Sequence, residues 1–412
     1  MRREQIERMF KLCVPCLLGL ESLISRELQK MDMAGIRAEN GRVYFTGKPE
    51  DIVRANLRLR TGERVLLELD RFEAASFEEL FEATAAIPWE EFLDPHAAFP
   101  VKGYSLDSAL FSVSSCQKII KKAIAQRLSS RYGRSWLPED GVKYQIQFAI
   151  MKNQVSLCFD TTGEGLHKRG YRPAHGAAPL KETLAAAIVE LSRYRGREEI
   201  WDPFCGSGTI PIEAALIARN IAPGLQRGFA SMEWPMLPSE MWERCRLEAK
   251  DLEFRGNYRI FASDIDSSAV SMARENALRA GVADCIRFTV KNALDTFPET
   301  EQGRILTNPP YGERMLDAAE AEKLYEAFGK RFAESRNWQV FLLSAHPEFE
   351  RSFGFLADRR RKLYNGMVRC NLFMYTDTEH KKLFTASLKR ESGFNRERSS
   401  GRSPRSGRKG NR

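Results

Sequence analysis

Asp202-Pro-Phe-Cys-Gly-Ser-Gly-Thr209 joins a short apolar strand to an apolar helix, and this junction sets the class of fold. The strand is Glu199-Ile-Trp201, and helical spacing of apolar residues follows from Thr209 to Ala218. Glycines at such a turn let the backbone bend tightly and approach a ligand, and ligands bind at the carboxyl ends of such strands. The stretch has neither the third glycine of a dinucleotide fingerprint nor the Gly-Lys-Ser/Thr of a phosphate loop. A carboxylate ahead of the glycines instead favours a cationic ligand.

Strands alternate with helices on both sides of this junction. Further strands are expected at 259–263, 285–290, 304–307 and 339–344, and further helices at 180–194, 268–280 and 318–332. This alternation predicts βαβ units and an α/β fold with a mostly parallel sheet. Two extended segments, 360–364 and 368–375, meet at Asn365-Gly366, a strong hairpin signal, and predict an antiparallel edge.

The first part of the chain predicts two α+β units, at about 10–57 and about 65–160. The second includes an alternating hairpin, 143–150 and 154–160, that turns near Lys152-Asn153. Residues 161–173 are rich in glycine and cations, which is typical of a linker. The chain is therefore divided into four segments: 1–60, 61–162, 163–385 and a basic tail at 386–412.

Composition narrows the class of protein. The 412 residues carry a net charge of +9, much of it in the tail, which has almost nothing to bury and is expected to be disordered. Such arms bind nucleic acid through phosphate charge, although a tail that only aids solubility is the alternative. No apolar run reaches the ~18 residues of a membrane span, and no signal peptide is evident, so a cytoplasmic location is expected. The scattered cysteines predict no metal site.

A second acidic position follows the strand at 259–263. A carboxylate here, Asp264, can accept both hydroxyls of a ribose, whereas Asp266 is better placed to cap the next helix. Asp264 lies much further from the glycines than the ~20 residues usual between such motifs, so an insertion is expected at about 220–257. The insertion contains a cationic residue and three aromatic residues: Arg227, Phe229, Trp234 and Trp242. We expect it either to cover the site, to touch substrate or to pack against the rest of the protein.

The strand at 304–307 ends in Asn308-Pro-Pro-Tyr311. Prolines are unsuited to a central strand but suit its tip, where Pro309 and Pro310 stiffen the turn. They would aim the Asn308 side chain and the Pro309 carbonyl, both acceptors, at one point. Two acceptors on an exocyclic amine would localise its lone pair and orient it, and Tyr311 offers a ring for stacking on a base. S-adenosyl-L-methionine (SAM), which is cationic and has no phosphate, fits the glycine stretch as a methyl donor.

Together these motifs resemble the THUMP-domain class I SAM-dependent RNA methyltransferases, and most closely the large-subunit ribosomal RNA guanine-N2 methyltransferases. The resemblance extends to Leu166–Arg172, Ala178–Ala185 and Lys362–Gly366. It implies a Rossmann-like class I methyltransferase domain at 163–385. It also implies an N-terminal ferredoxin-like segment and a THUMP domain that binds RNA.

The resemblance also implies roles for individual residues. Those expected to bind SAM are Asp202, Phe204, Gly206, Gly208, Thr209, Asp264, Ile265, Asn292, Ala293 and Asn308. Those expected to act in catalysis are Asn308, Pro309, Pro310 and Tyr311, and those expected to contact substrate RNA are Lys168, Arg169, Arg172 and Tyr311. Related enzymes often have an acid at the position of Asn292, contacting the adenine amine, and asparagine can accept that contact through its carbonyl.

The sequence therefore predicts a SAM-dependent methyltransferase acting on a guanine N2 amine in 23S rRNA or a large-subunit assembly intermediate. Adenine N6 in nucleic acid and the amide of a protein glutamine are alternative targets, because both are flat amino groups. A non-catalytic, SAM-binding assembly factor for ribosomal RNA is the alternative from another class.

Overall fold

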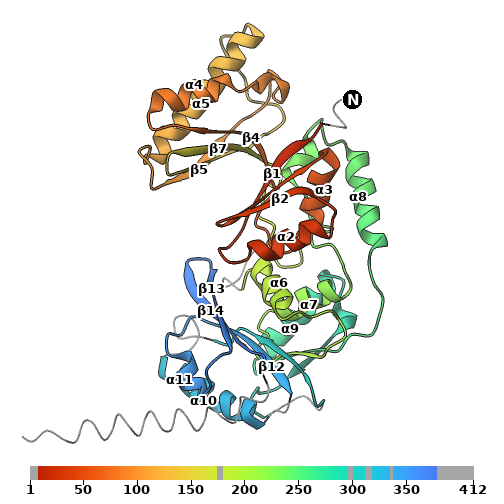
Figure 1. The fold of residues 1–412 in the computed structure, drawn as a ribbon. Coiled ribbons are helices and arrows are strands. Elements are labelled where there is room, and N and C mark those ends of the chain that lie inside the picture. The colour runs from red at the N-terminus through yellow and green to blue at the C-terminus, as the bar shows by residue number, and fades with distance from the viewer. Residues whose placement is uncertain (1–7, 174–179, 296–299, 311–317, 335–336, 378–412) are drawn as a thin grey trace, which may run out of the picture.

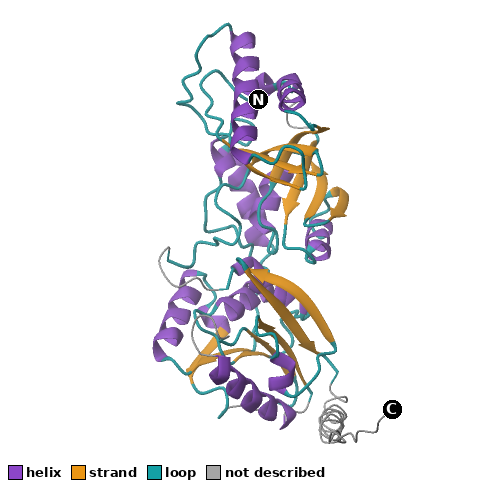
Figure 2. Cartoon of the chain, turned by 90° about the vertical axis from the view of Figure 1, so that its left-hand side faces the viewer, coloured by secondary structure: helices purple, strands orange, loops and turns teal. Residues whose placement is uncertain are grey.

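The computed structural model describes residues 8–173, 180–295, 300–310, 318–334 and 337–377. They form two parts stacked along one long axis (Figures 1 and 2). Tyr311 and the basic tail, both subjects of prediction, lie outside the described residues. Within the described ranges, no helix combines the length and apolar character needed to cross a membrane.

The N-terminal part is built on one seven-stranded sheet in the order β2-β3-β1-β4-β7-β6-β5. Its strands are β1 Phe10–Pro15, β2 Ala34–Glu39, β3 Arg42–Gly47, β4 Leu66–Glu73, β5 Val101–Leu106, β6 Ile146–Met151 and β7 Gln154–Asp160. The two predicted α+β units share this sheet because β4 pairs with β1 on one side and with β7 on the other. The predicted β6–β7 hairpin is confirmed, and Lys152 and Asn153 at its turn have positive φ.

Helices supply the core of the N-terminal part. They are α2 Glu21–Gln29, α3 Pro49–Arg58, α4 Phe77–Ala86, the 3-10 turn η1 Trp89–Glu91, and α5 Val113–Tyr132. Ile24, Ile52 and Ile120 from three of these helices are fully buried in one cluster with strand residues such as Leu12. The N-terminal sheet therefore has a helical layer of its own.

The C-terminal part has a second seven-stranded sheet in the order β10-β9-β8-β11-β12-β14-β13. Its strands are β8 Ile200–Asp202, β9 Ile260–Asp264, β10 Ile286–Val290, β11 Gly303–Thr307, β12 Trp338–Ser344, β13 Arg359–Asn365 and β14 Val368–Tyr375. The first five are mutually parallel, whereas β14 runs antiparallel to β12 and β13. The predicted mostly parallel sheet with an antiparallel hairpin at its edge is confirmed.

Helices pack on both faces of the second sheet. They are α6 Glu182–Leu191, α7 Thr209–Ala218, α9 Ser267–Arg279, the turn η3 Ala283–Cys285, α10 Ala318–Glu334 and α11 Phe349–Phe353. One core joins α6, α7 and α9 to the sheet, and a second, rich in phenylalanine, joins α10 and α11 to it. Because the five parallel strands point the same way, their carboxyl ends meet along one rim, called the carboxyl edge below.

The insertion at 220–257 folds back onto the N-terminal part. It contains the turn η2 Ala230–Glu233 and the helix α8 Ser239–Asp251, which lies beside α3 (Figure 1). Trp234 and Trp242 of the insertion are buried in the N-terminal core. Of the roles that the sequence left open, packing is therefore the one that the structure shows.

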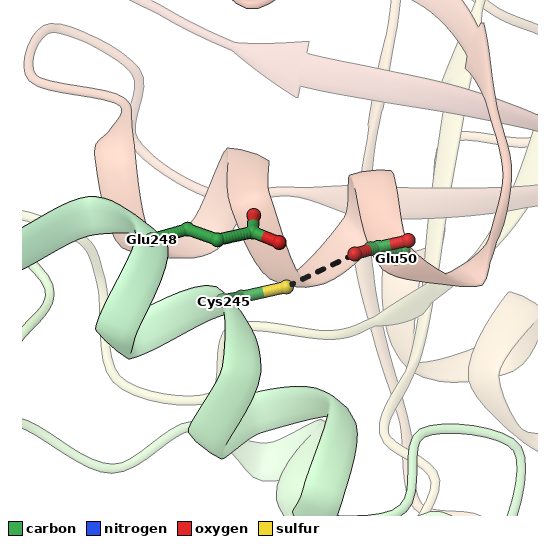
Figure 3. A group of neighbouring side chains, drawn as sticks. All are labelled: Glu50, Cys245 and Glu248. Atoms are coloured by element: carbon green, nitrogen blue, oxygen red, sulfur yellow. Dashed lines mark hydrogen bonds between the residues drawn. The ribbon is translucent and has the colours of Figure 1, made fainter. Parts of the chain in front are cut away.

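Arginines bridge α3 to α8 through a small acidic cluster. The cluster consists of Glu50 of α3 and of Cys245 and Glu248 of α8 (Figure 3). A carboxylate oxygen of each glutamate and the Sγ of the cysteine all lie within 4.8 Å of one another. Arg54 lies 3.3 Å from Glu50 and 3.1 Å from Glu248, and Arg244 lies 3.2 Å from Glu50. Burial raises the pKa of the Cys245 thiol to about 12, so this thiol stays protonated. The cluster is explained as an ion-pair contact between the two parts.

Candidate active site

The predicted glycine turn leads from β8 into α7, at the carboxyl edge. Gly206 and Gly208 have φ of +50° and +79°, a region that favours glycine. A Cβ on Gly208 would lie 2.8 Å from the Cβ of Ala273 on α9, so this glycine lets two helices approach. A Cβ on Gly206 would meet no atom within 4 Å. The backbone at Gly206 therefore borders open space in which a ligand can lie.

Asp202 ends β8 and is buried, with only 1% of its surface exposed. Its Oδ1 accepts a hydrogen bond from the Thr307 hydroxyl at 2.7 Å and another from the Phe204 N–H at 3.2 Å. Burial raises the pKa of Asp202 to about 7. Asp202 thereby fixes the glycine turn to the last residue of β11, directly before Asn308.

Asp264 lies beside the same turn. Its Oδ2 accepts the N–H of Gly206 at 2.9 Å, and its Oδ1 accepts the N–H of Asp266 at 3.1 Å. Asp266 caps α9 by accepting from the N–H of Ser268 at 2.8 Å, as predicted. Ile265 between them is 72% exposed, so an apolar surface adjoins the carboxylate. This combination suits a nucleoside, with hydroxyls for the acid and a base for the apolar surface.

The end of β10 forms the next boundary of the site. The N–H of Lys291 donates to the carbonyl of Asp264 at 3.0 Å, which holds the two strand ends together. Asn292 follows, and its Oδ1 accepts from the N–H of Leu294 at 3.0 Å. Ala293 is buried. The side-chain carbonyl predicted to contact adenine is thus already engaged within its own turn, with one lone pair left for a ligand.

Asn308 stands at the end of β11, one residue beyond Thr307. Its Oδ1 is buried and has no hydrogen-bond partner among the residues that the structure describes. A buried acceptor without a partner costs about 1–3 kcal/mol, so such an atom calls for an explanation. The prolines hold the turn, and the carbonyl of Pro310 accepts from the Tyr325 hydroxyl at 2.8 Å. The carboxyl edge therefore holds one unpaired buried acceptor, one residue beyond the threonine that is hydrogen-bonded to Asp202.

One of the predicted RNA contacts in the 161–173 segment, Arg169, requires correction. Arg169 is only 3% exposed and pairs with the fully buried Glu213 at 3.4 Å. The Nε of Arg172 donates to Glu182 at 2.7 Å. Arg169 is internal because Glu213 of α7 draws it in, so phosphate cannot reach it. Arg172 is partly exposed and already has a carboxylate partner on α6, and its contact with RNA remains a prediction. Lys168 is exposed, and its contact with RNA remains a prediction.

Three family models match the chain in sequence order. The RlmL ferredoxin-like domain matches residues 11–66, the THUMP domain residues 74–160, and the RMKL-like methyltransferase domain residues 169–373. YpsC of Bacillus subtilis, whose name assigns it provisionally as an RNA methyltransferase, is 41% identical over 364 residues, which are 87% of this chain and 94% of YpsC. The chain belongs to this family of THUMP-containing methyltransferases.

Other relatives agree with this assignment. The ribosomal RNA large subunit methyltransferase K/L of Shewanella loihica is 34% identical over 366 residues, which are 87% of this chain and 52% of that protein. The chain thus spans about half the length of the K/L methyltransferases. A crystal structure from Listeria monocytogenes, described as a predicted N6-adenine-specific DNA methylase, is 42% identical, with a TM-score of 0.85 over 90% of this chain and 97% of that one.

A further crystal structure identifies the cofactor class. It is the methyltransferase SMU.472 complexed with S-adenosylhomocysteine, 38% identical, with a TM-score of 0.84 over 90% of this chain and 98% of that one. The predicted class I methyltransferase fold and the predicted cofactor, SAM, are confirmed by these relatives. The open space at Gly206, the acid Asp264 and the exposed Ile265 fit this cofactor.

Two residues of the methyltransferase site were missed from the sequence. Thr307 holds Asp202, and Tyr325 of α10 holds the carbonyl of Pro310. Thr307 directly precedes Asn308, so a hydroxyl beside the motif was a signal that could have been used. Tyr325 gave no such signal, because only the tertiary fold brings α10 to the carboxyl edge.

Proposed function

We propose that this methyltransferase modifies the exocyclic N2 amine of a guanine in large-subunit ribosomal RNA. The observation that carries the proposal is the buried, unpaired Oδ1 of Asn308 at the end of β11, the strand that pairs with β8 ahead of the glycine turn. Such an acceptor gains a partner when an N–H donor enters the site. A guanine N2 amine is a donor of this kind.

The proposed chemistry relies on positioning. The amine lone pair is delocalised into the base, and acceptors on its N–H bonds favour a geometry in which that pair is available. The Asn308 carbonyl, together with the Pro309 carbonyl, supplies these acceptors. SAM supplies a methyl group on a sulfonium when bound. The amine nitrogen would form its bond to the methyl carbon as the bond from that carbon to the sulfonium sulfur breaks, which leaves a neutral thioether, S-adenosylhomocysteine. One amine proton would then leave to solvent, so no strong base is needed.

RNA is the proposed substrate because the chain carries a THUMP domain and its curated relatives are named as RNA methyltransferases. A base within a stack cannot reach a recessed site, so the target guanine is proposed to be flipped out. Adenine N6 is the second candidate, because Asn308 suits any flat amine and one structural relative carries an adenine-specific description.

The deciding experiment combines radiolabelled SAM with ribosomal RNA from cells that lack the gene. RNA is digested after the reaction, and labelled nucleosides are identified. Labelled N2-methylguanosine is the expected product. Asn308→Ala removes the acceptor and should lower kcat by about 10²–10³.

The matched control is Asn257→Ala, which changes an exposed asparagine of the insertion and should leave kcat unchanged. Labelled N6-methyladenosine would keep the mechanism and change the target. Full activity of Asn308→Ala would contradict the proposed catalytic role. Tight binding of SAM and RNA without transfer, on naked RNA and on assembly intermediates, would favour a non-catalytic assembly factor.

A further inference from the structure

The β13–β14 hairpin extends past the carboxyl edge near Asn308. Thr307 of β11 is paired with Leu342 of β12, and Leu342 is paired with Phe373 of β14. These three residues form one row across the sheet, called the Thr307 row below. Pairing of β14 with β13 continues past this row as far as Val368 and Asn365. At ~3.3 Å per residue, the turn stands roughly 17 Å beyond Thr307, on a strand about 10 Å to the side. The end of the hairpin therefore stands roughly 20 Å from Thr307, on the side of the sheet to which the carboxyl edge faces.

One face of the hairpin changes character along its length. At the Thr307 row this face carries Phe373, which packs against Phe349 of α11 with ring centroids 4.6 Å apart, and its cross-strand partner Arg360, which pairs with Glu350. Towards the turn the same face carries Lys362, then the cross-strand pair Tyr364 and Arg369. These side chains are exposed, Tyr364 by 40%. We call residues 362–369 the hairpin tip.

The charges of the hairpin tip have no partner in the described part of the chain. Arg360, two residues from Lys362, forms an ion pair with Glu350 at 2.8 Å. No described carboxylate forms an ion pair with Lys362 or Arg369. Met367, at the turn, is 98% exposed. A free cationic pair, a half-exposed aromatic ring and a bare apolar side chain are thus presented together.

The base of the hairpin is firmly held. Leu372 of β14 is buried in the core that also contains Leu20 of the N-terminal part, and so is Leu363, which lies within the hairpin tip and anchors it. Arg361 donates to the carbonyl of Gly19 at 2.6 Å. Figure 1 shows the hairpin, in blue, rising from the methyltransferase part towards α2. A tip on such a base is presented in a fixed position rather than as a loose loop.

We propose that the hairpin tip binds the RNA that flanks the target base, an inference that rests on the proposed function. Lys362 and Arg369 contact phosphates, because unpaired cations on a fixed surface match the phosphate backbone. Tyr364 and Met367 contact the exposed faces of neighbouring bases, which aromatic and apolar side chains recognise without reading sequence. One RNA strand can reach both the tip and Asn308, so the tip holds the strand while its neighbour base enters the site.

The test is the double variant Lys362→Gln/Arg369→Gln, which keeps a polar, unbranched side chain at each position and removes both charges. RNA affinity is measured over a range of salt concentrations, and methylation is measured under single turnover with saturating SAM. We expect RNA affinity to fall by at least ~10-fold and the slope of log affinity against log salt to decrease by about 1.4 for single-stranded RNA. A separate Tyr364→Ala/Met367→Ala variant should raise KM for RNA and leave the salt slope unchanged.

Arg287→Gln is the matched control, because Arg287 is an exposed cation on β10, at the opposite edge of the same sheet. This variant should keep the RNA affinity of the unmodified protein and the same dependence of that affinity on salt. SAM affinity and the melting temperature should be unchanged in all variants, since none of these side chains lies in a core or at the glycine turn.

The outcomes separate this inference from the proposed function. If the unmodified protein methylates RNA while the double variant keeps its RNA affinity, KM and salt slope, the inference is overturned and the function stands. If that variant aggregates with RNA affinity intact, the charges only protect an edge strand, which also overturns it. If the protein binds RNA but transfers no methyl group, the function fails, and the salt slope alone still decides the role of the tip.

Discussion

Asp202 links β8 to β11 by hydrogen bonds, and its carboxyl group gains or loses its proton near neutral pH. The carboxyl group is buried, and its pKa is raised to about 7, mainly because burial disfavours the charged form. The hydrogen bonds from Thr307 and Phe204 act in the opposite direction and lower the pKa. The same side chain therefore links β8 to β11 and makes the folded state sensitive to pH.

Asp202 should make the SAM-free protein less stable as pH rises from about 4 to about 7. The unfolded chain releases this proton near pH ~4, whereas the folded protein keeps it until about pH 7. The folded state thus binds more protons in this window, and the free energy of unfolding falls by up to about 1.4 kcal/mol per pH unit. Urea unfolding at several pH values measures this slope.

Asp202→Asn is the matching variant, since an amide does not titrate here and its carbonyl can still accept from Thr307. The difference in unfolding free energy between the variant and the unmodified protein should change across pH 4–7 and level off above pH 7. A difference that stays constant from pH 4 to 8 would show that Asp202 titrates normally.

Individual polar and charged residues show how far the site could be predicted from the sequence. Asp266 caps α9 as predicted, and Asp264 and Asn308 lie where predicted, at the ends of β9 and β11, because such strand ends are predictable. The roles of Asp264 and Asn308 in ribose binding and catalysis stay predictions. The burial of Arg169 was not predicted, because Arg169 lies in a cationic stretch that resembles an exposed linker. Its partner Glu213 is far along the chain, and only the fold brings the two together. The unpaired state of the Asn308 oxygen likewise depends on the whole of its surroundings.

The glycine turn shows two different uses of the same residue type within one element. Gly208 has a positive φ and no room for a side chain, because Ala273 lies against it. Gly206 has a positive φ and open space. One glycine therefore serves helix packing, and the other is proposed to serve ligand approach.

Alanine at each glycine should separate these uses. Gly208→Ala should lower the free energy of unfolding by more than the ~1–2 kcal/mol typical of a left-handed alanine, because the new methyl group overlaps α9. Gly206→Ala should stay near that value and weaken SAM binding by at least ~10-fold, because its methyl group enters the ligand space. Urea unfolding and calorimetric titration with SAM measure the two effects.

Gly281→Ala is a suitable reference for the free-energy cost of a positive φ at alanine without any steric overlap. Gly281 has a φ of +72° and open space around its Cβ, and it lies after α9, at the far end of that helix from the glycine turn. Equal stability losses at positions 208 and 281, or unchanged SAM affinity at position 206, would contradict the separation.

Elements of the methyltransferase part were predictable because their signals are local. The hairpin followed from Asn365-Gly366, and the parallel sheet from alternating strands and helices. The single N-terminal sheet was not predictable, since it depends on β4 pairing with β1 and β7 at once. Pairing between distant strands leaves no local mark in a sequence.

The insertion ties the two parts of the molecule into one unit. Residues Trp234, Leu237, Met241 and Trp242 belong to the methyltransferase sequence, yet they are buried in the N-terminal core. The N–H of Gly224 donates to the carbonyl of Leu57 at 2.9 Å, and Arg54 pairs with Glu248 across the same contact. Because the core of the N-terminal sheet is completed by a later segment, that sheet is not expected to be stable alone.

Trp242→Ala should therefore weaken a part of the protein that precedes it by many residues. Trp242 is fully buried and stacks on Phe229, with ring centroids 5.1 Å apart. Its removal should therefore lower the free energy of unfolding by about 3–5 kcal/mol. Hydrogen exchange should lose protection in β1 and β3 before β8 or β11, because the cavity lies in the N-terminal core. Trp338→Ala is the control, since Trp338 belongs to the core beneath α10 and should give the reverse order. Loss of protection in β8 and β11 first for both variants would mean that the insertion stabilises only its own domain.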